Sequence, residues 1–166
     1  MVRRDRLKIE LLSENLIIIL QEVMKQQYLC KLIKYNESNP LSQTNLVLPA
    51  SSLLMTSIFP YPFDSTVIIE DCIQLRIWVY KGDFQGADIS INDVFLDIIV
   101  AKSLFLITID GKPKLRPYAI MKELIKTFDG LSISTLGKLH FKDYAHIPLN
   151  GTKFDLFRIR AEMMTI

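Results

Sequence analysis

An alternating segment near the middle of the chain constrains the possible folds more than any other stretch. Apolar side chains occupy every second position, at Ile73, Leu75, Ile77 and Val79. This period of two is typical of a β-strand that buries one face, and it predicts a strand within residues 66–80. A second apolar run follows over residues 89–101. The two runs predict neighbouring strands joined by a glycine-containing loop over residues 81–88.

Other segments predict helices and further strands. Apolar residues recur every three or four positions over residues 5–27, which predicts an amphipathic helix. Pro117 and Gly130 suit the first and last positions of another helix. Residues 28–35 alternate and predict a short strand, whereas residues 53–59 predict one helical turn.

The carboxy-terminal part predicts a hairpin. Strand-like patterns over residues 138–146 and 153–163 flank Asn150 and Gly151, a dipeptide that favours tight turns between antiparallel strands. Together these patterns predict an α+β fold, an antiparallel sheet with the amino-terminal helix and a second helix packed on it. A length of 166 residues is typical of a single domain, here expected over residues 1–166.

Composition excludes several classes of function. A formal net charge of +2 is too small for a protein that grips nucleic acid by neutralising phosphates. Hydrophobic residues make up 49% of the chain, so we expect a large core or apolar surface that partners cover. The apolar run over residues 94–109 is interrupted by Asp97 and Lys102, so we expect no membrane-spanning segment and no membrane partner. Two cysteines in apolar stretches suggest free thiols and synthesis in the cytoplasm.

Loops are the expected contact surfaces. Residues 36–49 form a long segment without periodicity, and long loops in small domains are often functional or ordered by a partner. We expect partner contacts there and in the loop over residues 81–88. The expected interface residues are Asn39, Pro40, Leu41, Ser42, Gln43, Phe59, Tyr61, Phe63 and Phe84.

An enzymatic alternative rests on three residues. Asp97, followed by Asp110 and Lys112, loosely resembles the acidic pair and lysine of a metal-dependent nuclease, in which carboxylates hold the cation. In the competing interpretation Asp97 is an ordinary strand residue and Asp110-Gly111-Lys112 a tight turn. Matches of this looseness are common by chance, so we expect no catalytic residues, no metal and no cofactor.

The order of several short motifs resembles a known protein family. The motifs are residues 28–36, Asn39-Pro40-Leu41-Ser42, residues 58–63, the strand over residues 93–100, Arg116-Pro117-Tyr118 and residues 137–141. In this order, with the helices between them, the chain is similar to tail-terminator and tail-completion proteins from the neck of tailed bacteriophages.

The resemblance implies a tail-terminator-like fold and a structural function. Such a protein assembles with itself into a ring, typically a hexamer, that ends the tail tube. The ring joins the tube to the connector at the head–tail neck, and DNA passes through its lumen without sequence-specific contact. The expected location is the virion, after assembly in the host cytoplasm. Another connector or baseplate adaptor is the alternative within the same class.

Overall fold

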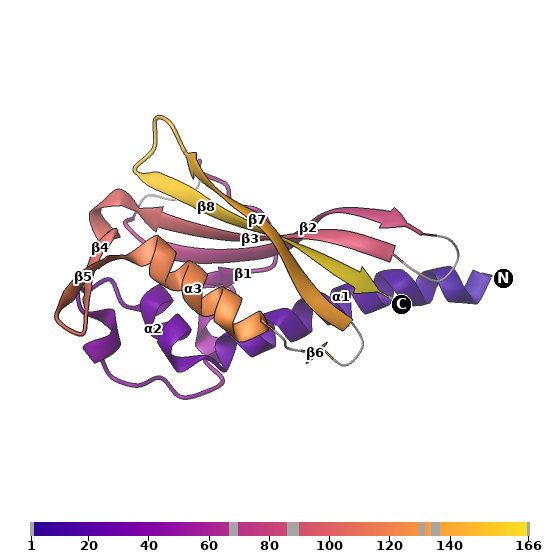
Figure 1. Cartoon of the computed structure of the whole chain (residues 1–166), viewed down its shortest axis with the longest axis horizontal. Helices are drawn as coiled ribbons and strands as arrows, with labels where there is room; N and C mark the ends of the chain where they lie inside the picture. The colour runs from indigo at the N-terminus through magenta and orange to yellow at the C-terminus, as the bar shows by residue number, and fades with distance from the viewer. Residues whose placement is uncertain (1, 67–69, 86–89, 130–131, 134–136, 166) are drawn as a thin grey trace.

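Four long antiparallel strands form the centre of the molecule, and three α-helices cover one of their faces (Figure 1). The computed structural model describes residues 2–66, 70–85, 90–129, 132–133 and 137–165. The helices are α1 (Val2–Met24), α2 (Gln27–Lys34) and α3 (Arg116–Phe128). The expected α+β class, with a mostly antiparallel sheet, is therefore confirmed.

The main sheet has the strand order β1-β2-β3-β8-β7-β6. Its strands are β1 (Ile58–Phe59), β2 (Ile73–Phe84), β3 (Ser90–Ala101), β6 (Ser132–Ile133), β7 (Gly137–Pro148) and β8 (Phe154–Thr165). Strand β1 runs parallel to β2, and the other pairs are antiparallel. Strands β4 (Leu106–Ile109) and β5 (Lys112–Leu115) form a separate hairpin. Its turn residues Asp110 and Gly111 have φ angles of 51° and 71°, the conformation of the tight turns that hairpins prefer.

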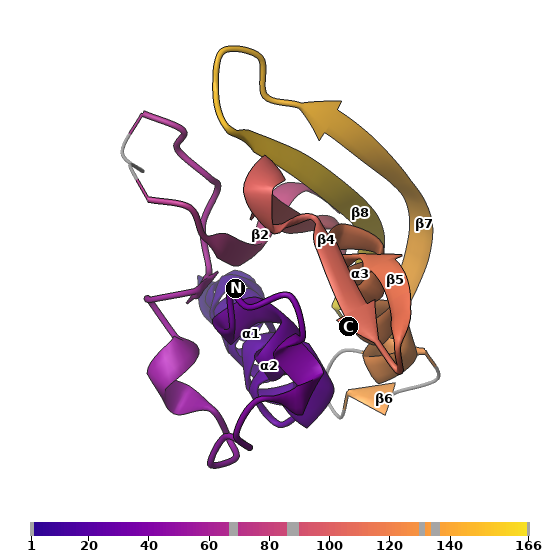
Figure 2. The same cartoon turned by 90° about the vertical axis from the view of Figure 1, so that its left-hand side faces the viewer.

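The core lies between the helices and one face of the sheet, which curves around them (Figure 2). Alternate strand residues point to this face, as the sequence period predicts. Leu75, Ile98 and Phe157 are neighbours across three strands and are all buried. The helices contribute Ile19, Leu29 and other apolar side chains to the same cluster. The alternation at Ile73, Leu75 and Ile77 was thus the pattern of a strand with one helix-covered face.

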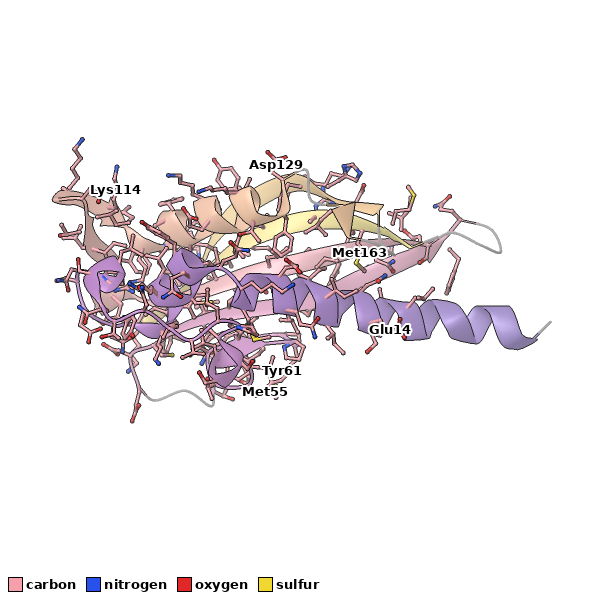
Figure 3. The ribbon with its side chains drawn as sticks, turned by 90° about the horizontal axis from the view of Figure 1, so that it is seen from below. Glu14, Met55, Tyr61, Lys114, Asp129 and Met163 are labelled. Atoms are coloured by element: carbon pink, nitrogen blue, oxygen red, sulfur yellow. The ribbon has the colours of Figure 1, made fainter. Side chains whose placement is uncertain are left out.

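Helix α1 extends beyond one end of the body that it packs on (Figure 1). Its amino-terminal part extends past the ends of the strands, whereas its last turns lie beside α2 (Figures 1 and 3). Within the described residues, no helix is long and apolar enough to cross a membrane.

The prediction of a strand over residues 28–35 was wrong, because this segment is helix α2. Its buried apolar residues are Leu29, Cys30, Leu32 and Ile33, which share one face of a helix. Lys31 projects from the opposite side of the helix and is also buried, because the loop after α2 covers that side. Its ammonium donates hydrogen bonds to the carbonyls of Leu41 and Gln43, at 3.0 Å and 2.6 Å.

Three other boundaries differ from the expected ones. Strand β2 continues to Phe84, so the first half of the expected loop over residues 81–88 pairs with β3, and Gly86 and Asp88 lie outside the described residues. The helical turn expected over residues 53–59 lies earlier in the chain, as η2 (Ser51–Leu53), and strand β1 follows it. The expected helix end at Gly130 also lies outside the described residues, and α3 ends at Phe128.

A buried arginine joins three parts of the fold. Arg116, the first residue of α3, is fully buried. Its guanidinium donates to five backbone carbonyl oxygens at 2.6–3.4 Å, those of Leu32, Tyr35, Asn36, Glu37 and Leu104. These are all five of its N–H donors, and four of the acceptors lie at or just beyond the end of α2. Burial lowers the pKa of Arg116 to about 10, so the group stays cationic at neutral pH and complements the negative end of the α2 dipole.

Replacing Arg116 should destabilise the whole fold. We expect Arg116→Met to lower the free energy of unfolding by about 3 kcal/mol or more, because five backbone carbonyls lose hydrogen bonds to a buried charged donor. Arg116→Lys should recover only part of this loss, since an ammonium has three donors instead of five. Urea denaturation measures both. Lys126→Met on the exposed side of α3 is the control, and an equally small effect of Arg116→Met would contradict this account.

A second prediction concerns the thiol of Cys30. It is buried and lies 3.4 Å from the carbonyl oxygen of Val23, and burial raises its pKa to about 11 from an ordinary value of 9.0. The folded protein therefore keeps the proton that the unfolded chain loses above pH 9. Stability should be complete below pH 9 and fall by about 2–3 kcal/mol by pH 11. Denaturation of Cys30→Ala across this range should lack this part of the decline; an identical pH slope would refute the prediction.

Candidate functional site

The face of the sheet opposite the helices carries charged and aromatic side chains, and we call it the open face. It is formed by the residues that alternate with the core positions, because successive strand residues point to opposite sides. Arg76, Asp97 and Arg158 are cross-strand neighbours at its centre. Trp78 and Phe95 form the next row. Arg76, Phe95 and Asp97 are 5%, 8% and 1% exposed, so the charged and aromatic side chains at the centre of this face largely shield one another from water.

Asp97 anchors the centre of the open face. Its carboxylate accepts hydrogen bonds from Arg158 at 2.7 Å and 2.8 Å, in a bidentate pair, and from the Trp78 indole at 3.0 Å. The Arg158 guanidinium also lies 4.1 Å from the centre of the Phe95 ring. Tyr80 stacks on the same ring at 4.8 Å. The Asp97 side chain is 1% exposed and that of Arg158 is 27% exposed, so the carboxylate is shielded from water and the guanidinium is partly so.

A clamp around Arg76 brings together three of the expected interface residues. Its guanidinium carbon lies 3.7 Å, 4.9 Å and 5.7 Å from the ring centres of Phe59, Tyr61 and Phe63. Its nitrogens donate to the Gln74 side chain at 2.6 Å and 3.0 Å. In the part of the chain that the structure describes, Arg76 pairs with no carboxylate. The rings thus hold the cation and fix the segment after β1 against the edge of the sheet.

This clamp changes the interpretation of the expected interface. Phe59 is buried, so its ring fills the clamp and offers no surface to a partner, which corrects its expected role. Tyr61 is 43% exposed, and Phe63 is half-buried against Phe154 at 5.8 Å. Tyr61 and Met55 lie on one side of the molecule, away from Lys114 and Asp129 on the other (Figure 3).

The remaining expected interface residues lie in two other places. Turn η1 (Pro40–Ser42) sits beside α2, where Lys31 holds the carbonyls of Leu41 and Gln43. Pro40 is buried there, which removes it from the expected contact set, whereas Asn39 and Ser42 are exposed. Phe84 ends β2 and is 71% exposed. The expected residues therefore form three separate groups.

The structure also separates the three residues of the nuclease alternative. Asp97 lies on the open face, and its two carboxylate oxygens are engaged by Arg158 and Trp78. Asp110 and Lys112 belong to the β4–β5 hairpin, on the side of the helices. Among the described residues, no three His, Cys, Asp or Glu side chains gather into a group that could hold a metal ion.

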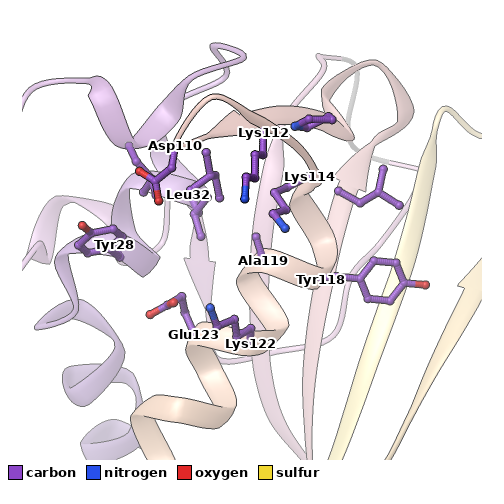
Figure 4. A pocket seen from close by; sticks show the side chains of 13 residues that line it. Tyr28, Leu32, Asp110, Lys112, Lys114, Tyr118, Ala119, Lys122 and Glu123 are labelled. Carbon is purple, nitrogen blue, oxygen red and sulfur yellow. The ribbon is translucent and has the colours of Figure 1, made fainter.

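Asp110 and Lys112 instead border a hollow of about 800 Å³ between α2, α3 and the β4–β5 hairpin (Figure 4). We call it the lysine hollow, because Lys112, Lys114 and Lys122 line it. Apolar side chains that include Leu32 and Ala119 form its floor. Sequence reasoning missed this site, since its lysines come from a strand and a helix that the chain pattern does not bring together.

The comparison with known families gives the origin of the protein. A family model, YomW, matches residues 26–163, from the start of α2 to the end part of β8. The chain belongs to the YomW family. This family is phage-derived, so the protein is phage-associated. No curated protein matches the chain.

The ion pair between the buried Asp97 carboxylate and the partly exposed Arg158 can be tested against a more exposed pair. Asp97→Asn should lower the free energy of unfolding by about 2–4 kcal/mol, because Arg158 loses its shielded partner. The pair of Asp143 with Arg160, at 2.7 Å on the same sheet, is the matched exposed control. Asp143→Asn should cost far less, because water screens that pair. Chemical denaturation compares them, and equal effects would show that burial of Asp97 contributes nothing.

Proposed function

We propose that the protein is a non-enzymatic structural component of a tailed-phage virion that assembles into a ring at the head–tail neck. In this proposal the ring, a hexamer, terminates the tail tube and joins it to the connector, and DNA passes through the lumen. The phage origin of the family and the motif order of the sequence support this proposal. The structural observation that carries it is a sheet with two open outer edges.

The first open edge belongs to β2. Strand β1 pairs only with Leu75 and Arg76, so no described strand pairs with the outer side of β2 beyond Arg76. The Leu75 amide donates outward to Ser57 at 2.8 Å. Because amide direction alternates along a strand, the amides of Ile77 and Val79 also point outward. Unpaired backbone groups of this kind are a template for pairing with another chain.

The second open edge belongs to β7. Strand β6 pairs only with Gly137 and Lys138. The same alternation, carried through the registers of β3 and β8, directs the amides of Tyr144 and His146 outward. Past Lys138, β7 has no outer strand neighbour among the described residues. The molecule therefore offers one pairing edge on each side.

The two edges are compatible with a closed ring. Strands β2 and β7 run in opposite directions, because three antiparallel steps separate them. If a second copy keeps the same orientation, its β7 can pair with β2 of the first copy in antiparallel fashion. Such a contact joins two different surfaces of one chain. Repeated by rotation, contacts of this heterologous type close into rings.

Exposed apolar surface also supports self-association. An apolar groove of about 330 Å³ is lined by residues of α1 and of the segment around η2, which include Ile17, Leu20 and Leu54. Across the molecule, Leu106, Tyr118 and Tyr144 are 45–67% exposed. Surfaces of this kind commonly mark protein contacts. A net charge of only +2 suits a lumen that must let DNA slide, because each neutralised phosphate adds affinity.

The ring can be tested by mixing two edge variants. Val79→Pro should block the β2 edge and Tyr144→Pro the β7 edge, because each removes an outward amide donor and leaves the inner ladder intact. Wild-type protein should have the mass of a ring by native mass spectrometry and multi-angle light scattering. Each variant alone should be monomeric. Their mixture should stop at a dimer, since only one good edge of each remains.

Two controls make the outcome decisive. Val79→Thr and Tyr144→Phe retain the amides and should retain the ring. Circular dichroism should show folded protein for both proline variants. A wild-type protein that stays monomeric, even when mixed with purified neck and tail components of its phage, would overturn the proposal. Rings that survive both proline changes would assign the contact to other surfaces.

A further inference from the structure

The lysine hollow has a cationic wall built from two elements. Lys112 and Lys114 are two residues apart on β5 and so project to the same side of the strand. Lys122 comes from the second turn of α3. The three ammonium groups lie around the hollow in Figure 4. None of them forms an ion pair with another described residue, so all three charges are available to a ligand.

The hollow is larger and less polar than a site for a single ion. Its volume of about 800 Å³ is typical of sites for nucleotide-sized molecules. Leu32, Leu41 and Ile109 line its apolar part. Tyr28 on α2 is 61% exposed and borders the hollow. Its ring is available for stacking on a flat heterocycle.

The hollow also has hydrogen-bond acceptors. The carboxylates of Asp110 and Glu123 line it together with Tyr28 (Figure 4). They can accept hydrogen bonds from amino groups, such as those of adenine, cytosine or guanine. The three lysines outnumber these two carboxylates, so the site as a whole favours an anion. The hollow therefore combines three lysines, apolar lining residues, an exposed ring and two acceptor carboxylates.

We propose that the lysine hollow binds a nucleotide unit, with its phosphate on Lys112, Lys114 and Lys122 and its base over Tyr28. An ammonium is a strong point-charge partner for phosphate. A free nucleotide and a nucleotide within single-stranded DNA present the same chemistry to this site. The binding site is a property of one protomer and does not depend on the ring.

Calorimetric titration of the full-length protein tests the site. The probes are dATP, inorganic pyrophosphate and a short single-stranded oligonucleotide, all in EDTA at low salt so that no metal bridges the phosphates. The variant is the triple change Lys112→Gln, Lys114→Gln, Lys122→Gln. Lys126→Gln, one helical turn beyond Lys122 and outside the hollow, is the matched control. We expect dATP to bind wild type and the control equally, and the triple variant at least tenfold more weakly.

Two comparisons identify the ligand. Tyr28→Ala should weaken dATP binding and leave pyrophosphate binding unchanged, because only the base uses the ring. Competition of the oligonucleotide with dATP would show that a DNA strand also uses the hollow; the lack of competition would assign it to free nucleotides. Absence of dATP and oligonucleotide binding, or binding that the triple variant retains, would overturn the proposal. Pyrophosphate that binds as tightly as dATP would also overturn it.

Discussion

The fold depends on one cation that has no carboxylate partner. Arg116 is fully buried and satisfied entirely by backbone carbonyls, most of them at the end of α2. Its side chain joins the end of α2 and the segment directly after it to the start of α3, about eighty residues further along the chain. Without this arginine, the carbonyls at and just beyond the end of α2 would lose the donors that the guanidinium supplies, and that of Leu32 would be left buried without one. The placement of both helices on the sheet, and hence of the hollow between them, follows from this interaction.

The sequence predicted the elements whose pattern depends on neighbouring residues. The alternation from Ile73 to Val79, the stripe of α1 and the Asn150-Gly151 turn all correspond to observed structure. Prediction from the sequence failed where a polar side chain forms its hydrogen bonds with backbone groups of another segment. Residues 28–34 belong to α2 instead of the expected strand, and this helix is covered on two sides: the core buries its apolar side, and a loop whose Leu41 carbonyl accepts from Lys31 covers the other. Gly82 resembled a loop residue, but it lies within β2, where a Cβ would be 2.4 Å from the Asn92 side chain.

The candidate surfaces show the same limit. Aromatic residues near Pro60 suggested a contact loop, yet the structure uses Phe59 to enclose Arg76. No local sequence pattern predicts the contact between Arg76 and these rings, because the arginine and the rings belong to separate segments. The sequence suggested Asp97 as a metal ligand, but in the structure its carboxylate accepts a hydrogen bond from Arg158, sixty-one positions further along the chain. Open strand edges and the lysine hollow likewise come from topology, which a single sequence does not display.

The opposite directions of β2 and β7 have a geometrical consequence for any assembly built by pairing them. Identical copies can be added in one common orientation, so the corresponding ends of their strands all lie on the same side of the assembly. The assembly then has two chemically different faces. One face would carry the β4–β5 turn and the β7–β8 turn of every copy, and the other face would carry the projecting start of α1. A body with two unlike faces can join two unlike neighbours, one on each side.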